Sequence, residues 1–328
     1  MNKISVIGAG TWGTTVAKIL SEKGFNVVIW AREAEVINSI NLKHENEIFL
    51  KGIKLPKKLK AVHNISDAIS ESKLLINAVP TQYIRTTLTS YGIAFKGNII
   101  LSLSKGIELK TFERPSEILY QIFKKPTYVL SGPNFAIEIA NKMPAATTIA
   151  GPDRAERKKL QKILNCKYFR VYENDDIVGT ELSGALKNVI AIAAGMCDAL
   201  GLGNNTKAAL ITRGLNEIRK FGKKFGAKDI TFLGLSGIGD LLLTCNSKIS
   251  RNYSVGYNLG KGKKLKEFIQ NTTHIAEGIK TSKAVYELSK KIGIEMPITN
   301  EVYYVIYHSK KPEDALKSLM SRRLKSEF

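Results

Sequence analysis

The chain is short of acidic residues, of cysteine and of long apolar runs, and each shortage excludes a class of protein. Its three cysteines, Cys166, Cys197 and Cys245, are odd in number and lack metal-ligand or redox spacing, which argues against a disulfide framework or a bound metal and fits a reducing cytoplasm. No run of about 18 uninterrupted apolar residues occurs, so we expect no membrane span. A predicted strand begins at residue 3, so we expect no signal peptide.

The shortage of acidic residues leaves 29 of them against 50 basic ones among 328 residues, a formal charge of +21. So basic a surface favours anionic partners, and nucleic acid is one class to consider. The lysines are scattered in short groups without interleaved aromatic residues, and no nucleic-acid motif accompanies them. We therefore expect no nucleic-acid partner and assign the charge to small anionic ligands.

Glycines follow the first predicted strand directly. Residues 3–7 form an apolar strand, Gly8, Gly10 and Gly13 come next, and a helical pattern then runs through residue 20. In a dinucleotide-binding unit the first glycine permits the tight turn, the second lets a pyrophosphate approach the backbone, and the third lets the helix pack closely on the sheet. A second strand at residues 26–30 completes the unit and favours this interpretation over a plain structural turn.

The residue after the second strand indicates which nicotinamide cofactor is used, because an acidic side chain there binds the ribose 2′-hydroxyl. This chain has Arg32 near that position, and a guanidinium pairs well with a 2′-phosphate. NADPH is therefore favoured as the cofactor, while NADH stays open through Glu33 or Glu35. The alternative is that Arg32 is simply a solvated residue at the start of the next helix, without a role in cofactor binding.

Strands alternate with helices in the first half of the chain, and the second half is almost wholly helical. The further strands are predicted at residues 73–79, 98–102, 128–131, 146–150 and 168–171. This pattern predicts an α/β domain with a doubly wound, Rossmann-type parallel sheet over residues 1–174 and an all-α domain over residues 175–328. Substrate is then expected between a dinucleotide-binding and a helical catalytic domain.

Two strand ends of the first domain carry candidate ligand contacts. Lys105 follows the strand at residues 98–102, and the carboxyl ends of parallel strands are where ligands bind, although a lysine at a strand end is also common without function. Gly132 and Asn134 follow the strand at residues 128–131, where Asn134 can cap the next helix and free N–H groups can touch an anion.

Two segments of the helical half carry the remaining candidates. Lys187 projects from a helix face of small and apolar residues, where lost hydration suits a proton donor or acceptor; a lysine that reaches solvent is the alternative. Asp240 stands where a helix begins and can cap it, but it can also orient a lysine from a facing helix. Ser250 is expected as an N-cap with Arg251 and Asn252 in the first turn, an arrangement that suits a phosphate; an ordinary cap with an exposed arginine is the alternative.

These segments together resemble the bacterial NAD(P)-dependent glycerol-3-phosphate dehydrogenases, over nearly the whole chain. The matching motifs are GAGTWGT at 8–14, SKG at 104–106, SGPNFA at 131–136, GALKNVIA at 184–191, TRG at 212–214, GIGDL at 237–241, SRN at 250–252, AEG at 276–278 and EMPI at 295–298. The family often has Thr for Ser104 and Thr or Ser for Asn134, and both replacements keep a hydrogen-bonding side chain.

The resemblance implies an oxidoreductase that interconverts dihydroxyacetone phosphate and sn-glycerol 3-phosphate with NAD or NADP, supplies phospholipid synthesis and acts as a cytoplasmic homodimer. It implies that Lys187 is the general acid and base, supported by Asp240 and Thr244. The implied substrate contacts are Lys105, Gly132, Asn134, Lys187, Asp240, Ser250, Arg251 and Asn252. The implied cofactor contacts are Gly8, Gly10, Thr11, Trp12, Gly13, Arg32, Lys105, Ala136, Arg251, Ile275 and Glu277.

Three other functions remain open at this point. A dehydrogenase of the same plan that acts on a 3-hydroxy acid or 6-phosphogluconate would look similar. A cofactor-sensing protein would keep the fold without needing a proton donor such as Lys187. A nucleic-acid-binding protein would bind random duplexes in a strongly salt-dependent way.

Overall fold

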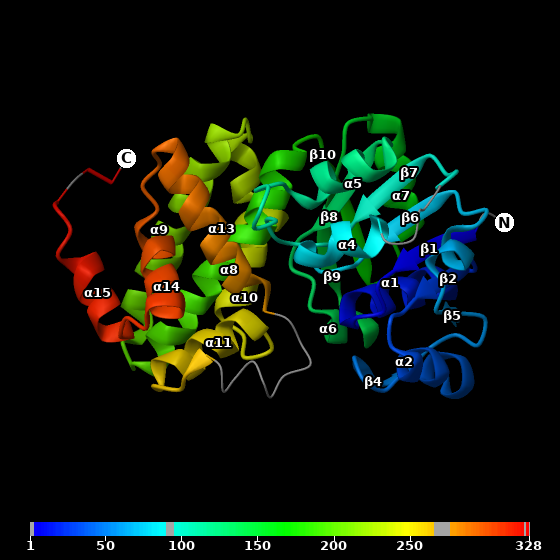
Figure 1. Ribbon diagram of the computed structural model, residues 1–328, viewed down its shortest axis with the longest axis horizontal. Helices are drawn as coiled ribbons and strands as arrows, with labels where there is room; N and C mark the ends of the chain where they lie inside the picture. Colours follow the sequence, from blue (N-terminus) through cyan, green and yellow to red (C-terminus); the bar gives the residue numbers. More distant parts are fainter. Residues whose placement is uncertain (1–2, 90–94, 266–275, 325, 328) are drawn as a thin grey trace. The chain divides into compact units, whose positions relative to one another are not determined.

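The computed structural model describes residues 3–89, 95–265, 276–324 and 326–327. The chain forms two compact units (Figure 1): the first comprises Met1–Lys105 and Glu113–Glu181, and the second comprises Gly106–Phe112 and Leu182–Phe328. The division falls within one long helix, α8 (Ile177–Ala199). The sequence-based limits of residues 1–174 and 175–328 stay a prediction.

An eight-stranded sheet forms the centre of the first unit, in the order β10-β9-β8-β7-β6-β1-β2-β5. The strands are β1 (Lys3–Ile7), β2 (Asn26–Trp30), β5 (Lys60–Val62), β6 (Leu74–Asn77), β7 (Ile99–Ser102), β8 (Thr127–Ser131), β9 (Ala145–Ala150) and β10 (Phe169–Asn174). The pairs are parallel except β8 with β9, which is antiparallel. Because β1 lies between β2 and β6, the strand order reverses beside β1, and ligands of such sheets bind at this point.

Helices cover both faces of this sheet. They are α1 (Thr11–Glu22), α2 (Ala34–Asn38), α3 (Ile65–Ile69), α4 (Ile84–Thr89), α5 (Pro115–Phe123), α6 (Ala136–Ala140) and α7 (Arg154–Leu164), with short turns η1 (Ser39–Lys43) and η2 (Thr81–Tyr83). One buried core joins the sheet to α1 and α7, and a second joins the opposite face to α3, α4 and α5. The central strands β1, β6, β7 and β8 are largely buried on both faces, which is why they are nearly continuous apolar runs in the sequence, whereas the edge strand β10 alternates buried with exposed residues. The predicted fold class is confirmed.

A small hairpin and one edge strand were not predicted from the sequence. The hairpin pairs β3 (Glu45–Asn46) with β4 (Leu50–Lys54) in antiparallel fashion, and β5 pairs only with β2. Each of these strands is only two to five residues long, and β3 contains no apolar residue, so neither a helical nor a strand period stands out.

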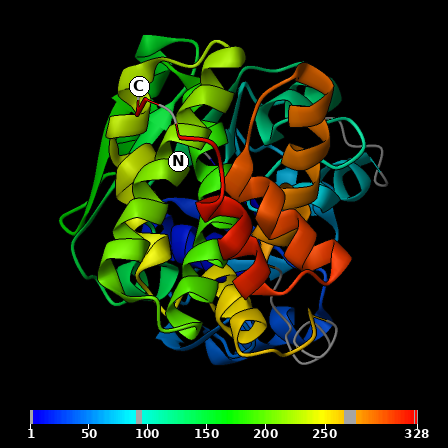
Figure 2. The ribbon, with the colours of Figure 1, turned by 90° about the vertical axis from the view of Figure 1, so that its left-hand side faces the viewer.

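The second unit is helical, and its elements after α8 are α9 (Gly203–Lys224), η3 (Asp229–Leu233), η4 (Leu235–Gly239), α10 (Asp240–Cys245), α11 (Arg251–Gly260), α13 (Glu277–Ile292), α14 (Pro297–His308) and α15 (Pro312–Met320). Figure 2 shows α14 packed beside α13, with α15 against α14. Helix α8 is long and apolar enough to cross a membrane by composition, but 89% of that apolar stretch is buried inside the protein. Its apolar surface is therefore covered by the protein's own core.

Candidate active site

The glycine loop (residues 8–13) connects β1 to α1 and depends on glycine for steric reasons. Gly8 has φ +110°, a conformation that side chains with a Cβ rarely adopt. A Cβ on Gly13 would lie 2.0 Å from the carbonyl oxygen of Gly8. Both glycines are therefore required by the local backbone alone, which lets α1 begin directly beside the end of β1.

Gly10 differs from these two glycines in what surrounds it. A Cβ built on Gly10 would meet no described atom within 4 Å, although this residue is the N-cap of α1 and has no side chain to cap the helix. The first turn of a helix has N–H groups without helical partners, and these favour a bound anion. A dinucleotide pyrophosphate fits this loop, because the backbone is approachable at Gly10 while Gly8 and Gly13 are closed by protein atoms.

Arg32 follows β2 and is highly exposed. Its side chain is 79% accessible, and its guanidinium contacts the carboxylate of Glu33 at 2.6 Å. An exposed ion pair of this kind contributes little to stability, so the guanidinium is available to a competing anion. Both a cation and a carboxylate therefore lie where the ribose 2′-substituent is recognised in such folds.

A polar network fixes the turn that carries Lys105. The amide of Asn77, at the end of β6, donates to the Ser104 hydroxyl at 2.9 Å, and that hydroxyl donates to the carbonyl oxygen of Val79 at 2.6 Å. Lys105 Nζ donates to the carbonyl oxygen of Gly132 at 3.0 Å. The structure thus brings two predicted substrate contacts together at the carboxyl edge of the sheet, because β6, β7 and β8 are parallel.

Asn134 does not cap the following helix, contrary to the expectation from the sequence. The N-cap of α6 is Phe135, and the Asn134 amide donates instead to the Thr147 hydroxyl at 3.1 Å. The hydroxyl of Thr147 donates to the carbonyl oxygen of Ser131, so β9 holds this turn from the side. The Asn134 side chain therefore points toward β9, and the residues next to Asn134 in the sequence do not predict this.

Ala136, the first residue of α6, lies beside the helix of the glycine loop. The Thr15 hydroxyl approaches the carbonyl oxygen of Ala136 at 3.3 Å, across 121 residues of sequence. Trp12 packs edge-on against Phe169 at a centroid distance of 6.0 Å, and its Nε1 is buried without a hydrogen-bond partner among the described residues. Thr11, Trp12 and Ala136 therefore belong to one region of the first unit.

A buried ion pair in the second unit joins Lys187 to Asp240. Lys187 Nζ lies 2.6 Å from Asp240 Oδ1 and 2.6 Å from Thr244 Oγ1. The three residues are 6%, 1% and 2% exposed. The Thr244 hydroxyl donates to the backbone carbonyl of Asp240, one turn earlier in α10, so its lone pair accepts from the lysine. Two of the ammonium donors are therefore fixed in direction by α10.

The first turn of α11 holds the predicted phosphate contacts. The Ser250 hydroxyl accepts from Tyr253 N at 3.2 Å, which makes it the N-cap as expected, and Arg251 is exposed at the first helical position. Asn252 is buried, and its amide donates to Asn188 Oδ1 at 2.8 Å while its oxygen accepts from Gly278 N at 2.9 Å. Asn252 thus ties α11 to α8 and to the start of α13, where Glu277 lies.

Asn77 and Asn188 were not predicted as site residues, but Asn77 contacts Ser104 beside Lys105, and Asn188 contacts Asn252. In the sequence, Asn77 could have been noticed as a polar residue at the end of an apolar strand, and Asn188 as the residue next to Lys187. Ile275 lies outside the described residues. No group of three or more His, Cys, Asp or Glu side chains suited to a metal occurs in the part of the chain that the structure describes.

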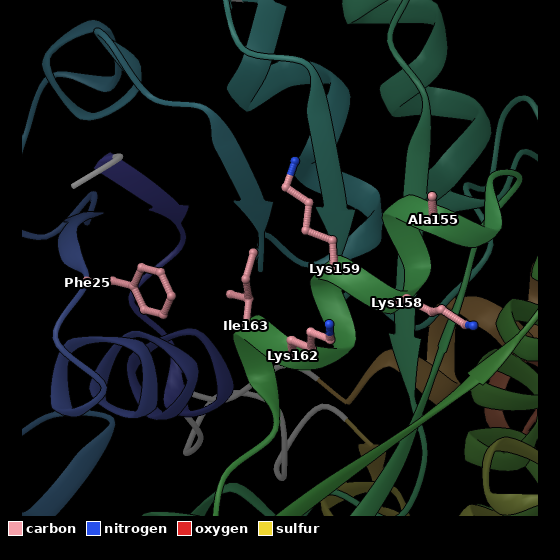
Figure 3. Close-up of a pocket in the computed structure, with 6 residues that line it drawn as sticks. All are labelled: Phe25, Ala155, Lys158, Lys159, Lys162 and Ile163. Atoms are coloured by element: carbon pink, nitrogen blue, oxygen red, sulfur yellow. The ribbon is translucent and has the colours of Figure 1, made fainter.

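A surface hollow of about 510 Å³ lies elsewhere on the first unit, along α7. Figure 3 shows Phe25 directed toward Ile163, while Lys158 points away from both. The lining residues are Phe25, Ala155, Lys158, Lys159, Lys162 and Ile163, none of which was predicted as a site residue.

Comparison with family models gives a match in each half of the chain. Residues 3–157 match the model of the NAD-dependent glycerol-3-phosphate dehydrogenase N-terminus, and residues 176–317 match that of the C-terminus. The chain is 46% identical over 330 residues to a glycerol-3-phosphate dehydrogenase [NAD(P)+] of Citrifermentans bemidjiense, covering 99% of this chain and 98% of that protein. A protein of the same name from Leptospira biflexa is 44% identical, with 99% of each chain covered.

Solved structures agree with these matches. Glycerol-3-phosphate dehydrogenase from Coxiella burnetii superposes with a TM-score of 0.94 at 35% identity, covering 98% of this chain and 99% of the other. A D-mandelate dehydrogenase is similar at a TM-score of 0.65 with only 17% identity, covering 96% of this chain and 99% of the other, and this likeness concerns the fold alone.

Proposed function

Because the chain belongs to the NAD-dependent glycerol-3-phosphate dehydrogenase family and interconverts dihydroxyacetone phosphate and sn-glycerol 3-phosphate with NAD or NADP, we propose that Lys187 is the acid and base of this reaction. The observation that supports this role is the buried ammonium of Lys187, held at 2.6 Å by both Asp240 and Thr244. The predicted family, enzyme class and cofactor type are confirmed.

The chemistry explains why a buried lysine suits this step. The nicotinamide, when bound, supplies a hydride to the carbonyl carbon of the substrate. Negative charge then develops on the carbonyl oxygen, and Lys187 donates a proton to it; in the reverse direction neutral Lys187 accepts the hydroxyl proton. Asp240 and Thr244 fix Nζ in place, so little reorganisation is needed as the proton moves.

The phosphate of the substrate is proposed to bind at the first turn of α11. Ser250 caps this helix, Arg251 supplies a guanidinium at its first position, and the Asn252 amide is fixed by its hydrogen bond to Asn188. A guanidinium binds phosphate through paired charge-assisted hydrogen bonds, and the helix N-terminus adds favourable partial charge. Lys105, Gly132 and Asn134 are the further proposed substrate contacts.

The glycine loop with Thr11, Trp12 and Ala136 is proposed to hold the dinucleotide, together with Lys105, Arg251, Ile275 and Glu277. We further propose a preference for NADPH, because the Arg32 guanidinium is 79% exposed and its pair with Glu33 is readily exchanged for a 2′-phosphate. Arg32→Ala should lower kcat/KM for NADPH about tenfold and leave that for NADH nearly unchanged. An equal effect on both cofactors would refute this role of Arg32.

The test of Lys187 is the rate of NADPH oxidation after addition of dihydroxyacetone phosphate, for the wild type, Lys187→Ala and Lys187→Arg. We expect Lys187→Ala to abolish turnover but to bind NADPH with an unchanged Kd, measured by fluorescence titration. Lys187→Arg keeps the charge beside Asp240 but is a poor proton donor, so it should restore stability without restoring turnover. Full turnover in Lys187→Ala would exclude a chemical role.

The cellular setting is also a proposal. The three cysteines are free thiols, which supports a cytoplasmic location. The product is the glycerol phosphate unit of phospholipids, so we propose that the enzyme supplies phospholipid synthesis. A homodimer is proposed from the family resemblance, and light scattering of the purified protein would test it.

A further inference from the structure

Asn46 is fully buried at the end of β3, in the hairpin that the sequence did not predict. Its amide nitrogen donates to the carbonyl oxygen of Ala9 at 2.8 Å and to the Thr14 hydroxyl at 2.9 Å. Its amide oxygen accepts from the backbone N–H of Phe49 at 3.1 Å. The reversed amide would place its oxygen against the Ala9 carbonyl and its NH₂ against an N–H donor, so these partners define one orientation.

The carbonyl oxygen of Ala9 receives a second donor, the Thr14 hydroxyl at 3.1 Å. The peptide between Ala9 and Gly10 is planar and trans, so its C=O and its N–H point in opposite directions. With the carbonyl held on the buried side by Asn46 and Thr14, the N–H of Gly10 must point away from the core. That N–H belongs to the N-cap of α1, where a Cβ would meet no described atom within 4 Å.

The glycine loop needs such an external restraint because of its composition. Gly8 and Gly10 flank Ala9, and glycine permits many backbone orientations, so the loop sequence alone does not fix this peptide. A binding site that must be ordered by its ligand loses affinity, and prior ordering recovers it. Asn46 supplies that ordering from a hairpin 37 residues away.

We propose that Asn46 is a positioning residue for the dinucleotide: its buried amide orients the Ala9–Gly10 peptide so that the N–H of Gly10 faces the cofactor phosphates. This rests on the proposal that the glycine loop holds the dinucleotide. Asn46 does not itself contact the reacting atoms. It acts through the backbone, and its effect therefore falls on cofactor affinity and not on the chemical step.

The test is Asn46→Asp, which keeps the size of the side chain but replaces the NH₂ donor with an acceptor that repels the Ala9 carbonyl. We expect Kd and KM to rise about tenfold for NADPH and NADH alike, since the pyrophosphate is common to both. The value of kcat at saturating cofactor and the KM for dihydroxyacetone phosphate should stay within about twofold of wild type, because the phosphate contacts and Lys187 are untouched.

Asn41→Asp is the matched control. Asn41 makes a similar clamp, donating to the carbonyl oxygen of Ala61 at 2.9 Å and accepting from Ala61 N at 2.9 Å, but this clamp holds η1 to β5 and not the glycine loop. Asn41→Asp should lower the melting temperature without changing either cofactor Kd.

A second variant, Thr14→Val, removes the other donor to the Ala9 carbonyl and should raise both cofactor Kd values about threefold, which keeps the test open if Asn46→Asp does not fold. Unchanged Kd values in folded Asn46→Asp or Thr14→Val, or an equal rise in Asn41→Asp, would overturn the inference. Failure of the wild-type protein to bind either cofactor would instead refute the proposed function of the loop.

Discussion

Removal of both charges from the Lys187–Asp240 pair should destabilise the second unit far less than the two single removals added together. The two side chains are almost fully buried, at 6% and 1% exposure, and their charged atoms are 2.6 Å apart. Asp240→Asn preserves size and an oxygen acceptor for the lysine but leaves a buried ammonium without a counter-charge. A buried pair broken in this way costs about 3–5 kcal/mol, and Lys187→Met should cost a similar amount for the same reason.

The double variant Lys187→Met/Asp240→Asn leaves no buried charge at this pair, so its cost should fall well below the sum of the two single costs. We expect a coupling free energy of at least about 2 kcal/mol from the double-mutant cycle. Urea unfolding followed by far-ultraviolet circular dichroism measures it, because the second unit is helical. Tryptophan fluorescence is the complementary probe, since both tryptophans, Trp12 and Trp30, lie in the first unit. Single costs that add within about 0.5 kcal/mol would refute the reasoning.

Three further outcomes are expected. Arg251→Ala should raise the KM for dihydroxyacetone phosphate about 100-fold and the cofactor Kd by a smaller factor, measured by steady-state kinetics and binding titration; an unchanged KM would place the phosphate elsewhere. Gly13→Ala should destabilise the protein by about 1–3 kcal/mol, because its Cβ would lie 2.0 Å from the Gly8 carbonyl oxygen, whereas Gly10→Ala should keep the melting temperature and weaken cofactor binding. Burial raises the pKa of Glu217 to about 7, although hydrogen bonds from the backbone of Ile298 and Thr299 act to lower it. The folded protein therefore holds this proton more tightly than the unfolded chain, and the stability that Glu217 contributes below about pH 4.5 is lost as the pH rises toward 7. Glu217→Gln should flatten the fall in urea midpoint over this range, and an unaltered slope would contradict the assignment.

The sequence predicted the parts of the fold that depend on local pattern. Strands β1, β2, β6, β7 and β8 are largely apolar runs because helices cover both faces of the sheet, so they stand out against their polar surroundings. Strand β10 instead alternates buried with exposed residues, and β9 consists mostly of small residues. The hairpin β3–β4 has no such pattern, because β3 is only Glu45–Asn46 and the two apolar residues of β4 are separated by a lysine and a glycine. Asn134 shows the limit of local reasoning: an asparagine before a helix is a natural cap, yet Thr147 on β9 takes its amide instead.

The sequence alone determined the glycine loop, the alternating sheet domain, the helical second half and the candidate chemistry of Lys187, because each of these follows from residues close together in the chain. The family resemblance already implied that Asp240 and Thr244 support Lys187, and the tertiary structure brings the three into contact across 53 and 57 residues. Only the tertiary structure decided that Asn46 and Asn77 fix the loops at the sheet edge. Side-chain hydrogen bonds form over distances of about 3 Å between segments whose separation in sequence carries no signal. Their partners are set by packing, and therefore by the whole fold.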